Sequence, residues 1–147
     1  MSLFICEPKT SAEFDMYYDL RWRVLRKPWG QALGTEKDEN ENNAFHILVC
    51  SLDGHAEGVG RIHFVSPQQC QVRYMAVEPN LRNKGLGTKI LVHLEKYAKR
   101  KLALSITVNA RENAVGFYRK HGYDIYEDGE KLFQQIKHYK MLKYISL

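Results

Sequence analysis

The segment 82–88 combines two glycines with basic side chains in a pattern that suits an anion. It follows an apolar, strand-like run over 72–77 and precedes a stretch in which Ile90, Leu91 and Leu94 recur at helical spacing. Glycines at a helix start let backbone N–H groups approach a ligand closely, and the helix N-terminus adds about half a positive charge. The segment therefore predicts a site for a phosphate group.

Two common phosphate-binding motifs do not fit this segment. A P-loop requires GxxxxGK[ST], but no glycine stands at the required distance before Gly87. The dinucleotide motif GxGxxG requires a third glycine at the position held by Ile90. The pattern that does fit is [RQ]xxGx[GA], with Arg82, Gly85 and Gly87 at its fixed positions. Placed after a strand, it resembles the coenzyme A site of the GCN5-related N-acetyltransferase (GNAT) family.

A second stretch strengthens this resemblance. Residues 113–123 are similar to another hallmark of the family, in which an asparagine is followed by a tyrosine and then by a glycine–aromatic pair. Tyr123 stands where the family usually has phenylalanine. The resemblance covers nearly the whole chain and is weakest before residue 44. It implies a mixed α/β fold, with a mainly antiparallel central sheet flanked by helices, and acetyl-CoA as co-substrate.

The resemblance also implies which residues bind coenzyme A. The pyrophosphate would lie on the backbone amides of the glycine segment, with charge from Arg82 and Lys84. The amide-rich pantetheine arm would pair with an exposed strand edge. Asn113 would hydrogen-bond this arm, or else serve only the first turn of its helix. The implied binding residues are Met75, Ala76, Val77, Arg82, Asn83, Lys84, Gly85, Leu86, Gly87, Thr88, Asn113 and Tyr118.

Tyr118 falls at the position of the family's general acid. A phenol with a pKa of about 10 can return a proton to the departing thiolate of coenzyme A. The other interpretation is a core aromatic residue. Because neighbouring helical residues point about 100° apart, one of Phe117 and Tyr118 can face the core while the other faces a cleft.

The general base is less well determined by the sequence. Attack by an amine needs a neutral nitrogen, which a carboxylate, a histidine or a relayed water can provide. The candidates on expected strands are His46, Glu57, His63 and His138. The segment 136–141 resembles the (I)xHxxM ending of one bacterial branch of the family, which makes His138 the first choice. A structural hydrogen-bonding role is the alternative for each histidine.

The expected function is transfer of an acetyl group from acetyl-CoA to a primary amine in a ternary complex. A covalent acyl-enzyme is not needed, since no cysteine falls in the expected site with a paired base. The acceptor is not readable from the chain, and a homodimer is possible. One alternative is a non-catalytic module that senses acyl-CoA. A nucleic-acid-binding domain is a weaker alternative, because the basic residues lack an aromatic–basic pattern.

The elements that must position these residues can be read from hydrophobic periodicity. Helices are expected from Thr10 or Ser11 to near Pro28, after Gly85 to about Lys101, and from about Arg111 to Lys120. Strands are expected over 3–6, 44–52, 57–65, 70–77, 102–108, 123–126 and 135–145. The expected order is β-α-β-β-β-α-β-α-β-β.

Two charged segments invite a functional reading. The acidic run 36–41 could rim the acceptor cleft and attract a cationic amine, although a solvated loop is the plainer interpretation. The basic group of 21–27 could bind nucleic acid, although a helix with one solvated face is the plainer interpretation.

Composition sets broad limits. A chain of 147 residues that is 44% hydrophobic and 27% charged fits a single folded domain over 1–147. Its net charge of +5 suits a polyanionic cofactor as well as nucleic acid. Cys6, Cys50 and Cys70 form no CxxC pair and are expected to be buried thiols, with no metal site. The absence of a long apolar run or a signal-like N-terminus favours a cytoplasmic location without membrane contact.

Overall fold

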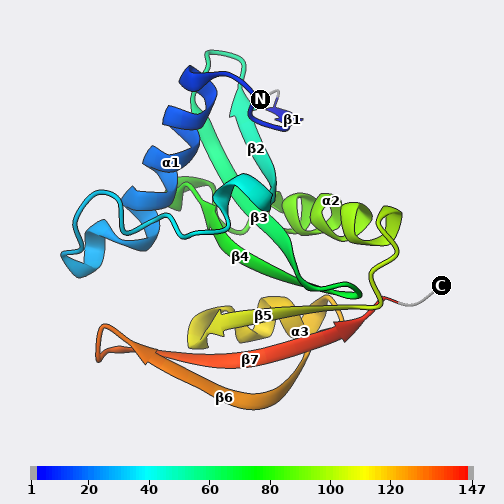
Figure 1. Cartoon of the computed structure of the whole chain (residues 1–147). Helices are drawn as coiled ribbons and strands as arrows, with labels where there is room; N and C mark the ends of the chain where they lie inside the picture. The colour runs from blue at the N-terminus through cyan, green and yellow to red at the C-terminus, as the bar shows by residue number, and fades with distance from the viewer. Residues whose placement is uncertain (1–2, 146–147) are drawn as a thin grey trace.

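A computed structural model describes residues 3–145 and shows helices packed on both faces of one central sheet (Figure 1). The strands are β1 (Leu3–Cys6), β2 (Phe45–Ser51), β3 (Ala56–Ser66), β4 (Gln69–Val77), β5 (Ser105–Arg111), β6 (Asp124–Leu132) and β7 (Ile136–Tyr144). The helices are α1 (Ser11–Leu25), α2 (Leu86–Arg100) and α3 (Val115–Lys120). Short 3-10 turns are η1 (Lys27–Trp29), η2 (Glu41–Asn43), η3 (Pro79–Leu81) and η4 (Glu112–Ala114).

The sheet has the strand order β1-β2-β3-β4-β5-β7-β6. Its neighbouring strands pair in antiparallel fashion, except that β4 and β5 run parallel. A parallel pair needs a crossover connection, and α2 supplies it. The expected mixed, mainly antiparallel sheet is therefore confirmed, as is the order of its helices and strands.

Helix α1 begins with a capping box and covers one face of β2, β3 and β4. The Thr10 hydroxyl accepts from the Glu13 N–H, while the Glu13 carboxylate accepts from the Thr10 N–H. Its buried Tyr17 and Leu20 pack in one cluster with apolar residues of the three strands, namely Leu48, Val59 and Ala76. On this face, β5 and β7 lie beyond the helix, so their side chains remain available to a ligand.

Helix α2 lies on the opposite face, and its apolar stripe forms the larger core with the sheet. Two glycines of β3 allow this close approach. A Cβ at Gly60 would lie 2.5 Å from Cγ2 of Ile90, and a Cβ at Gly58 would lie 2.9 Å from Cδ1 of the same side chain. Glycine is thus required here because the helix occupies the space of a side chain.

The structure moves two expected boundaries near the site. The strand expected over 102–108 is found at Ser105–Arg111, because the chain after α2 first reverses through Leu102, at a φ of 65°. The N–H groups of Leu102 and Ala103 still bond the last turn of α2. The helix expected from Arg111 accordingly starts at Val115, and the strand expected over 123–126 extends from Asp124 to Leu132. Apolar runs alone did not locate these ends.

Candidate functional site

The sheet opens between its two parallel strands. β4 and β5 pair from Gln69 with Ser105 as far as Val72 with Val108. Beyond that pair β4 continues to Val77 and β5 to Arg111, and no further register joins them among the described residues. Since strand edges carry backbone N–H and C=O groups, this opening offers hydrogen-bonding partners to an amide-rich ligand.

A β-bulge at Tyr74 accompanies this opening. Arg73 pairs with Arg61 of β3, but Ala76 pairs with Val59, so β4 has one extra residue. The backbone of Tyr74 has a φ of 57°, an unusual conformation for a bulky residue. Because of the extra residue, Val72 packs in the core under α2 whereas Ala76 packs under α1. The bulge thus changes which side chains face each helix.

Arginine side chains surround the Tyr74 ring and hold it in place. The guanidinium carbons of Arg21, Arg73 and Arg61 lie 4.2, 4.6 and 5.0 Å from the ring centroid. Such cation–π contacts contribute about 0.5–2 kcal/mol each, depending on how far they are desolvated. They are the packing that fixes this strained residue.

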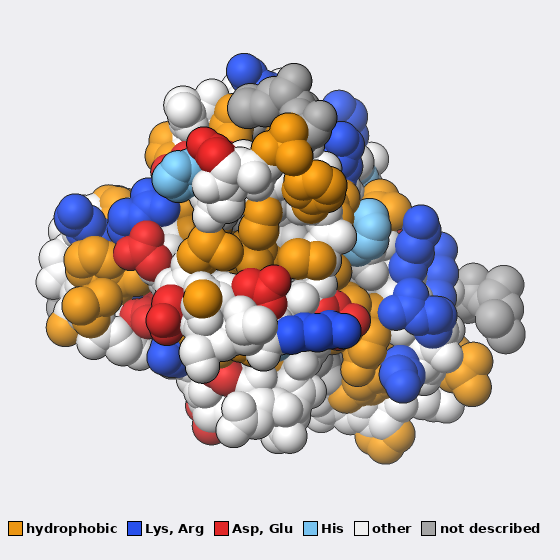
Figure 2. All heavy atoms as spheres, turned by 90° about the horizontal axis from the view of Figure 1, so that it is seen from above, with side chains coloured by type: hydrophobic (Ala, Val, Ile, Leu, Met, Phe, Trp, Pro, Cys, Tyr) orange, Lys and Arg blue, Asp and Glu red, His pale blue; other side chains and the backbone are white. Residues whose placement is uncertain are grey.

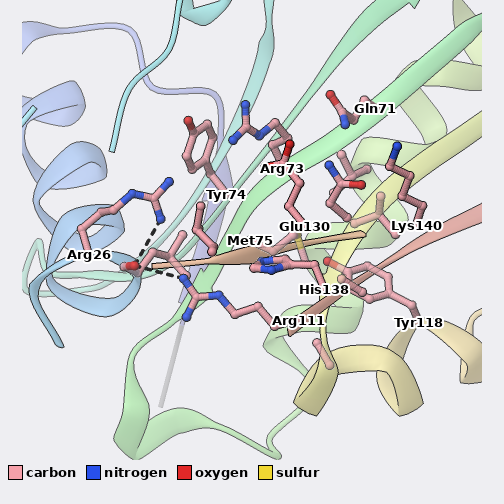
Figure 3. Close-up of a pocket in the computed structure, with 17 residues that line it drawn as sticks. Arg26, Gln71, Arg73, Tyr74, Met75, Arg111, Tyr118, Glu130, His138 and Lys140 are labelled. Atoms are coloured by element: carbon pink, nitrogen blue, oxygen red, sulfur yellow. Dashed lines mark hydrogen bonds between the residues drawn. The ribbon is translucent and has the colours of Figure 1, made fainter. Parts of the chain in front are cut away.

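A cavity of about 430 Å³ lies at the opening and reaches across the sheet. Strands β4, β5, β6 and β7, the end of α1, and η4 with α3 all contribute to its walls. Figure 3 shows its polar and ionisable side chains converging from these elements. The lining includes Arg26, Arg73, Met75, Arg111, Tyr118, Glu130, His138 and Lys140.

Tyr118 projects from α3 into this cavity and is only 5% exposed. The rings of Phe117 and Tyr123 contact it edge-on, with centroids 5.0 and 5.6 Å away. Burial raises the pKa of Tyr118 well above that of a free phenol. The described residues offer its hydroxyl no hydrogen-bond partner, so this protonated phenol is available to a ligand.

His138 reaches the same cavity from β7. Burial lowers the pKa of His138, and the charges of Arg111 and Arg26 act in the same direction, against the carbonyls of Ile136 and Glu130. Its Nδ1 lies 3.0 Å from the Ile136 carbonyl oxygen, which can only accept. Nδ1 therefore carries the proton of the neutral ring, and Nε2 carries the lone pair.

The other candidate bases lie outside the cavity lining. His46 is buried between the Tyr17 hydroxyl and the Glu41 carbonyl, at 2.7 and 2.8 Å. His63 is buried with its Nδ1 3.2 Å from a guanidinium nitrogen of Arg61. Glu57 lines a separate hollow with Arg23 and Glu78. Geometry thus singles out His138 among the four.

The glycine segment forms a turn with amides directed out of the helix. Asn83 and Gly85 have φ values of 64° and 83°, and Gly85 is the N-cap of α2. The first backbone hydrogen bond at the N-terminus of α2 is donated by the Lys89 N–H to the Gly85 carbonyl oxygen, at 3.1 Å. The amides of 86–88 precede it and have no acceptor within the helix. This geometry is that of an anion-binding helix start.

Helix α3 packs directly on this turn. A Cβ at Gly87 would lie 3.3 Å from the Phe117 ring, and the Thr88 hydroxyl lies 3.0 Å from Nε2 of His121. The adjacent residue on α3, Tyr118, faces the cavity. The turn and the cavity therefore share one helix as their common wall.

The remaining expected binding residues lie at different distances from the cavity. Met75 lines it, while Ala76 and Val77 continue the β4 edge and pair with β3 on their other side. Arg82 is extended between η3 and the turn. Asn113 lies exposed in η4, next to the lining residue Ala114, but is not itself part of the lining.

The acidic run is only partly the solvated loop expected from the sequence, and its Asp38 pairs with Arg73 of the cavity lining. Its Asp38 and Glu41 turn inward and pair with Arg61 at 2.6 and 2.8 Å, and Glu41 also pairs with Arg21 at 2.9 Å. Both arginine side chains have no exposed surface. The solvated loop was therefore a wrong prediction for Asp38 and Glu41, whereas Glu39 is exposed as expected. The solvated basic face was wrong for Arg21, which is buried and paired with Glu41.

Surface charge, metal ligands, membrane-spanning helices and the cysteines were the other subjects of the sequence expectations. On the face drawn in Figure 2, the largest group of Lys and Arg lies at the right, while Asp and Glu lie at the left and in the middle among other basic side chains. Between residues 3 and 145, no three His, Cys, Asp or Glu side chains are grouped as metal ligands would be. No described helix has the length and apolar character needed to span a bilayer. Cys70 is buried and Cys6 and Cys50 are half-buried, all as free thiols.

Sequence reasoning missed the cationic part of the lining. Arg26, Arg73, Arg111 and Lys140 all border the cavity. Arg111 could have been found from the alternation along β5, where Ile106, Val108 and Ala110 are buried and the intervening residues face the other way. That signal was hidden because the strand was expected to end at Val108.

Comparisons with known proteins agree with this geometry. A family model described as the acetyltransferase (GNAT) family matches residues 14–123. The uncharacterized N-acetyltransferase YjcF from Bacillus subtilis (strain 168) is 34% identical over 130 residues, which cover 88% of this chain and 90% of YjcF.

Solved structures share the fold at low identity. An acetyltransferase of the GNAT family from Staphylococcus aureus Mu50 superposes with a TM-score of 0.82 at 13% identity, over 99% of this chain and 100% of that one. An aminoglycoside 6'-N-acetyltransferase solved in complex with coenzyme A has a TM-score of 0.80 at 15% identity, over 100% and 98% of the two chains.

Proposed function

We propose that this chain, which belongs to the acetyltransferase (GNAT) family and is an acyltransferase enzyme, moves an acetyl group from acetyl-CoA to a primary amine. The observation that carries the proposal is the opening between β4 and β5 beyond Val72 and Val108, bordered by Tyr118 and His138. An opened parallel pair has unpaired backbone groups that an amide-containing arm can use. The coenzyme A complex of a structure with the same fold supports this donor.

The turn 82–88 is proposed to bind the pyrophosphate of acetyl-CoA. The positive φ values of Asn83 and Gly85 and the free amides at the start of α2 support this assignment. Arg82 and Lys84 add positive charge at the same turn. The pantetheine arm then extends along Met75, Ala76 and Val77 toward the cavity, and Asn113 is proposed to hydrogen-bond it from η4.

In the proposed reaction, the neutral amine attacks the thioester carbonyl carbon, so that a C–N bond forms while the C–S bond breaks. Backbone N–H groups near Met75–Val77 polarise the carbonyl oxygen. The amine proton passes to Nε2 of His138, and the thiolate takes a proton from the Tyr118 hydroxyl. The lowered pKa of His138 keeps its ring neutral and the raised pKa of Tyr118 keeps its phenol protonated, which are the starting states that these two roles need.

The transfer is proposed to be direct. Cys6, Cys50 and Cys70 are absent from the cavity lining, and burial raises the pKa of each thiol. A protonated thiol outside the cavity lining is a poor nucleophile for a covalent acyl-enzyme. A ternary complex instead places the amine beside the thioester, where proximity itself contributes to the rate.

A combined binding and turnover assay tests the proposal. Acetyl-CoA is expected to raise the thermal midpoint of the protein, and a panel of primary amines is expected to include acceptors that release free CoA. Tyr118→Phe is expected to retain the thermal shift and lose most of the turnover. An unchanged midpoint at millimolar acetyl-CoA contradicts the proposal, whereas a shift without CoA release for any amine favours a sensor of acyl-CoA.

A further inference from the structure

The cavity has an excess of positive charge. Arg26, Arg73, Arg111 and Lys140 line it, whereas Glu130 is the one acidic side chain that the described residues contribute to the lining. Two of the cations have their own partners, since Arg73 pairs with Asp38 at 2.8 Å and Lys140 pairs with Glu127 at 3.0 Å. The other two cations of the lining are Arg26 and Arg111.

These two guanidinium groups converge on one backbone oxygen. The Leu25 carbonyl at the end of α1 accepts from Arg26 at 3.2 Å and from Arg111 at 3.0 Å, as Figure 3 shows. Arg26 also donates to the Thr35 carbonyl at 3.0 Å. Within residues 3–145, neither arginine has a carboxylate at ion-pair distance.

Two cations held together without a counter-ion are unfavourable in a desolvated place. Arg26 is only 8% exposed, and burial lowers the pKa of both side chains. An anionic ligand would relieve this energetic cost, because five-donor guanidinium groups bind carboxylates and phosphates with charge-assisted hydrogen bonds. The site is therefore prepared for an anion.

The anion in question is not the pyrophosphate of the donor. The turn 82–88 is the proposed site for that group at the start of α2, and none of its residues lines the cavity, although the charge of Arg82 reaches Arg111. The two arginines instead line the same cavity as the proposed base, His138, and their charges lower its pKa. In Figure 3 the His138 ring lies beside the Arg111 side chain.

We infer that the acceptor carries an anionic group close to its amine, and that Arg26 and Arg111 bind this group while the amine lies at His138. The inference rests on the proposed acetyltransferase function. The acceptor class is then a small amino acid or an amino alcohol phosphate, with carboxylate or phosphate as the shared chemistry. Polyamines and aminoglycosides are excluded, because their positive charges would meet the same arginines.

Matched pairs of amines test this inference in the protein saturated with CoA. The probes are glycine against glycinamide, O-phosphoethanolamine against ethanolamine, and spermidine, with affinities measured by isothermal titration calorimetry. The anionic member of at least one pair is expected to bind about tenfold or more tightly than its neutral partner. The pair that shows the preference distinguishes a carboxylate site from a phosphate site.

Variants connect the preference to the arginines. Arg111→Gln and Arg26→Gln are expected to abolish it, Arg111→Lys to retain part of it, and Arg100→Gln, at the exposed end of α2, to leave it unchanged. Thermal midpoints of all variants check that they fold. The inference about the acceptor is overturned by equal affinities within both pairs, or by no binding of either anionic probe at millimolar concentration. Tighter binding of spermidine would also overturn it. None of these outcomes affects the proposed function. Failure of CoA itself to bind overturns the proposed function.

Discussion

Val72 and Val108 form the last pair of the parallel ladder between β4 and β5, and both side chains are buried. Immediately beyond Val72, the bulge at Tyr74 redirects β4, while β5 continues to Arg111. The sheet therefore closes on one side of this pair and opens on the other. This single boundary places Tyr118 and His138 around one opening, and α3 connects that opening with the glycine turn.

The left-handed glycine of the turn gives the first prediction. Gly85→Ala should weaken acetyl-CoA binding, because alanine disfavours a φ of 83° and would shift the amides that follow. It should also lower the free energy of unfolding by about 1–2 kcal/mol. Calorimetric titration with acetyl-CoA and chemical denaturation measure the two effects.

Gly54 provides the matched control. It has a φ of 84° in the turn between β2 and β3, and, like Gly85, it has no atom within 4 Å of a built Cβ. Gly54→Ala should therefore lose similar stability and keep full affinity for acetyl-CoA. Equal loss of affinity in both variants would mean that the turn at Gly85 has only a structural role.

The second prediction concerns the proposed acid. Tyr118→Phe should lower kcat by about 10²-fold or more with unchanged affinity for acetyl-CoA, because only the proton donor is lost. Tyr123→Phe is the control, since the Tyr123 hydroxyl donates to Glu95 at 2.7 Å and lies outside the cavity lining. That variant should lose stability and retain kcat. Normal turnover by Tyr118→Phe would remove the acid from the mechanism.

The third prediction is a pH dependence of kcat. Because the pKa of His138 is lowered below its usual 6.5, the ring should be neutral at pH 7 and the rate should fall only at more acidic pH. In His138→Gln the rate should be lower by about 10²-fold and this acidic limb should vanish. His93→Gln, on the exposed face of α2, should keep the wild-type profile. An acidic limb that survives in His138→Gln would assign the base elsewhere.

The fourth prediction concerns the buried ion pairs. Burial alone would raise the pKa of Asp38, but hydrogen bonds from Arg61 and the Asn40 N–H, with nearby positive charge, lower it to about 2. A depressed carboxyl pKa stabilises the fold above the unfolded value of 3.8, and this stability is lost as the pH falls toward 2. Acid titration of the wild type followed by circular dichroism should show this loss.

Removing the carboxylate should have a large effect at neutral pH as well. Asp38→Asn leaves Arg61 with a buried, partly unpaired charge and should lower the free energy of unfolding by about 3–5 kcal/mol. Asp19→Asn removes an exposed ion pair with Arg23 and should change the free energy of unfolding by about 0.5 kcal/mol or less. Similar losses in the two variants, measured by urea denaturation, would show that the buried network contributes little.

Much of the fold was predictable because its signals are local. The strand ending at Val77, the glycine turn and the amphipathic α2 follow one another in sequence, so periodicity and spacing were sufficient. The start of α1 was likewise expected at Thr10 or Ser11, and the structure has Thr10 as the N-cap, bonded to Glu13 three residues later. The order of strands and helices followed from these elements.

The features that the sequence did not predict depend on contacts between segments far apart in the chain. The bulge at Tyr74 is a left-handed tyrosine stabilised by arginines from α1 and β3, and no local pattern marks it. Arg111 meets the end of α1 through the Leu25 oxygen, across 86 positions of the chain. Inward-facing Asp38 and Glu41 resemble a solvated run until their buried arginine partners are known.

In the proposed function, the opening beyond Val72 and Val108 and the turn at the start of α2 together hold an acyl-CoA donor. Titration of the ¹⁵N-labelled protein with acetyl-CoA, followed by ¹H–¹⁵N correlation spectra, tests it residue by residue. The largest shifts are expected at the amides of 83–88 and 75–77, with small shifts in β1 and the turn at Gly54. Shifts confined to other segments, or none at millimolar acetyl-CoA, would contradict it.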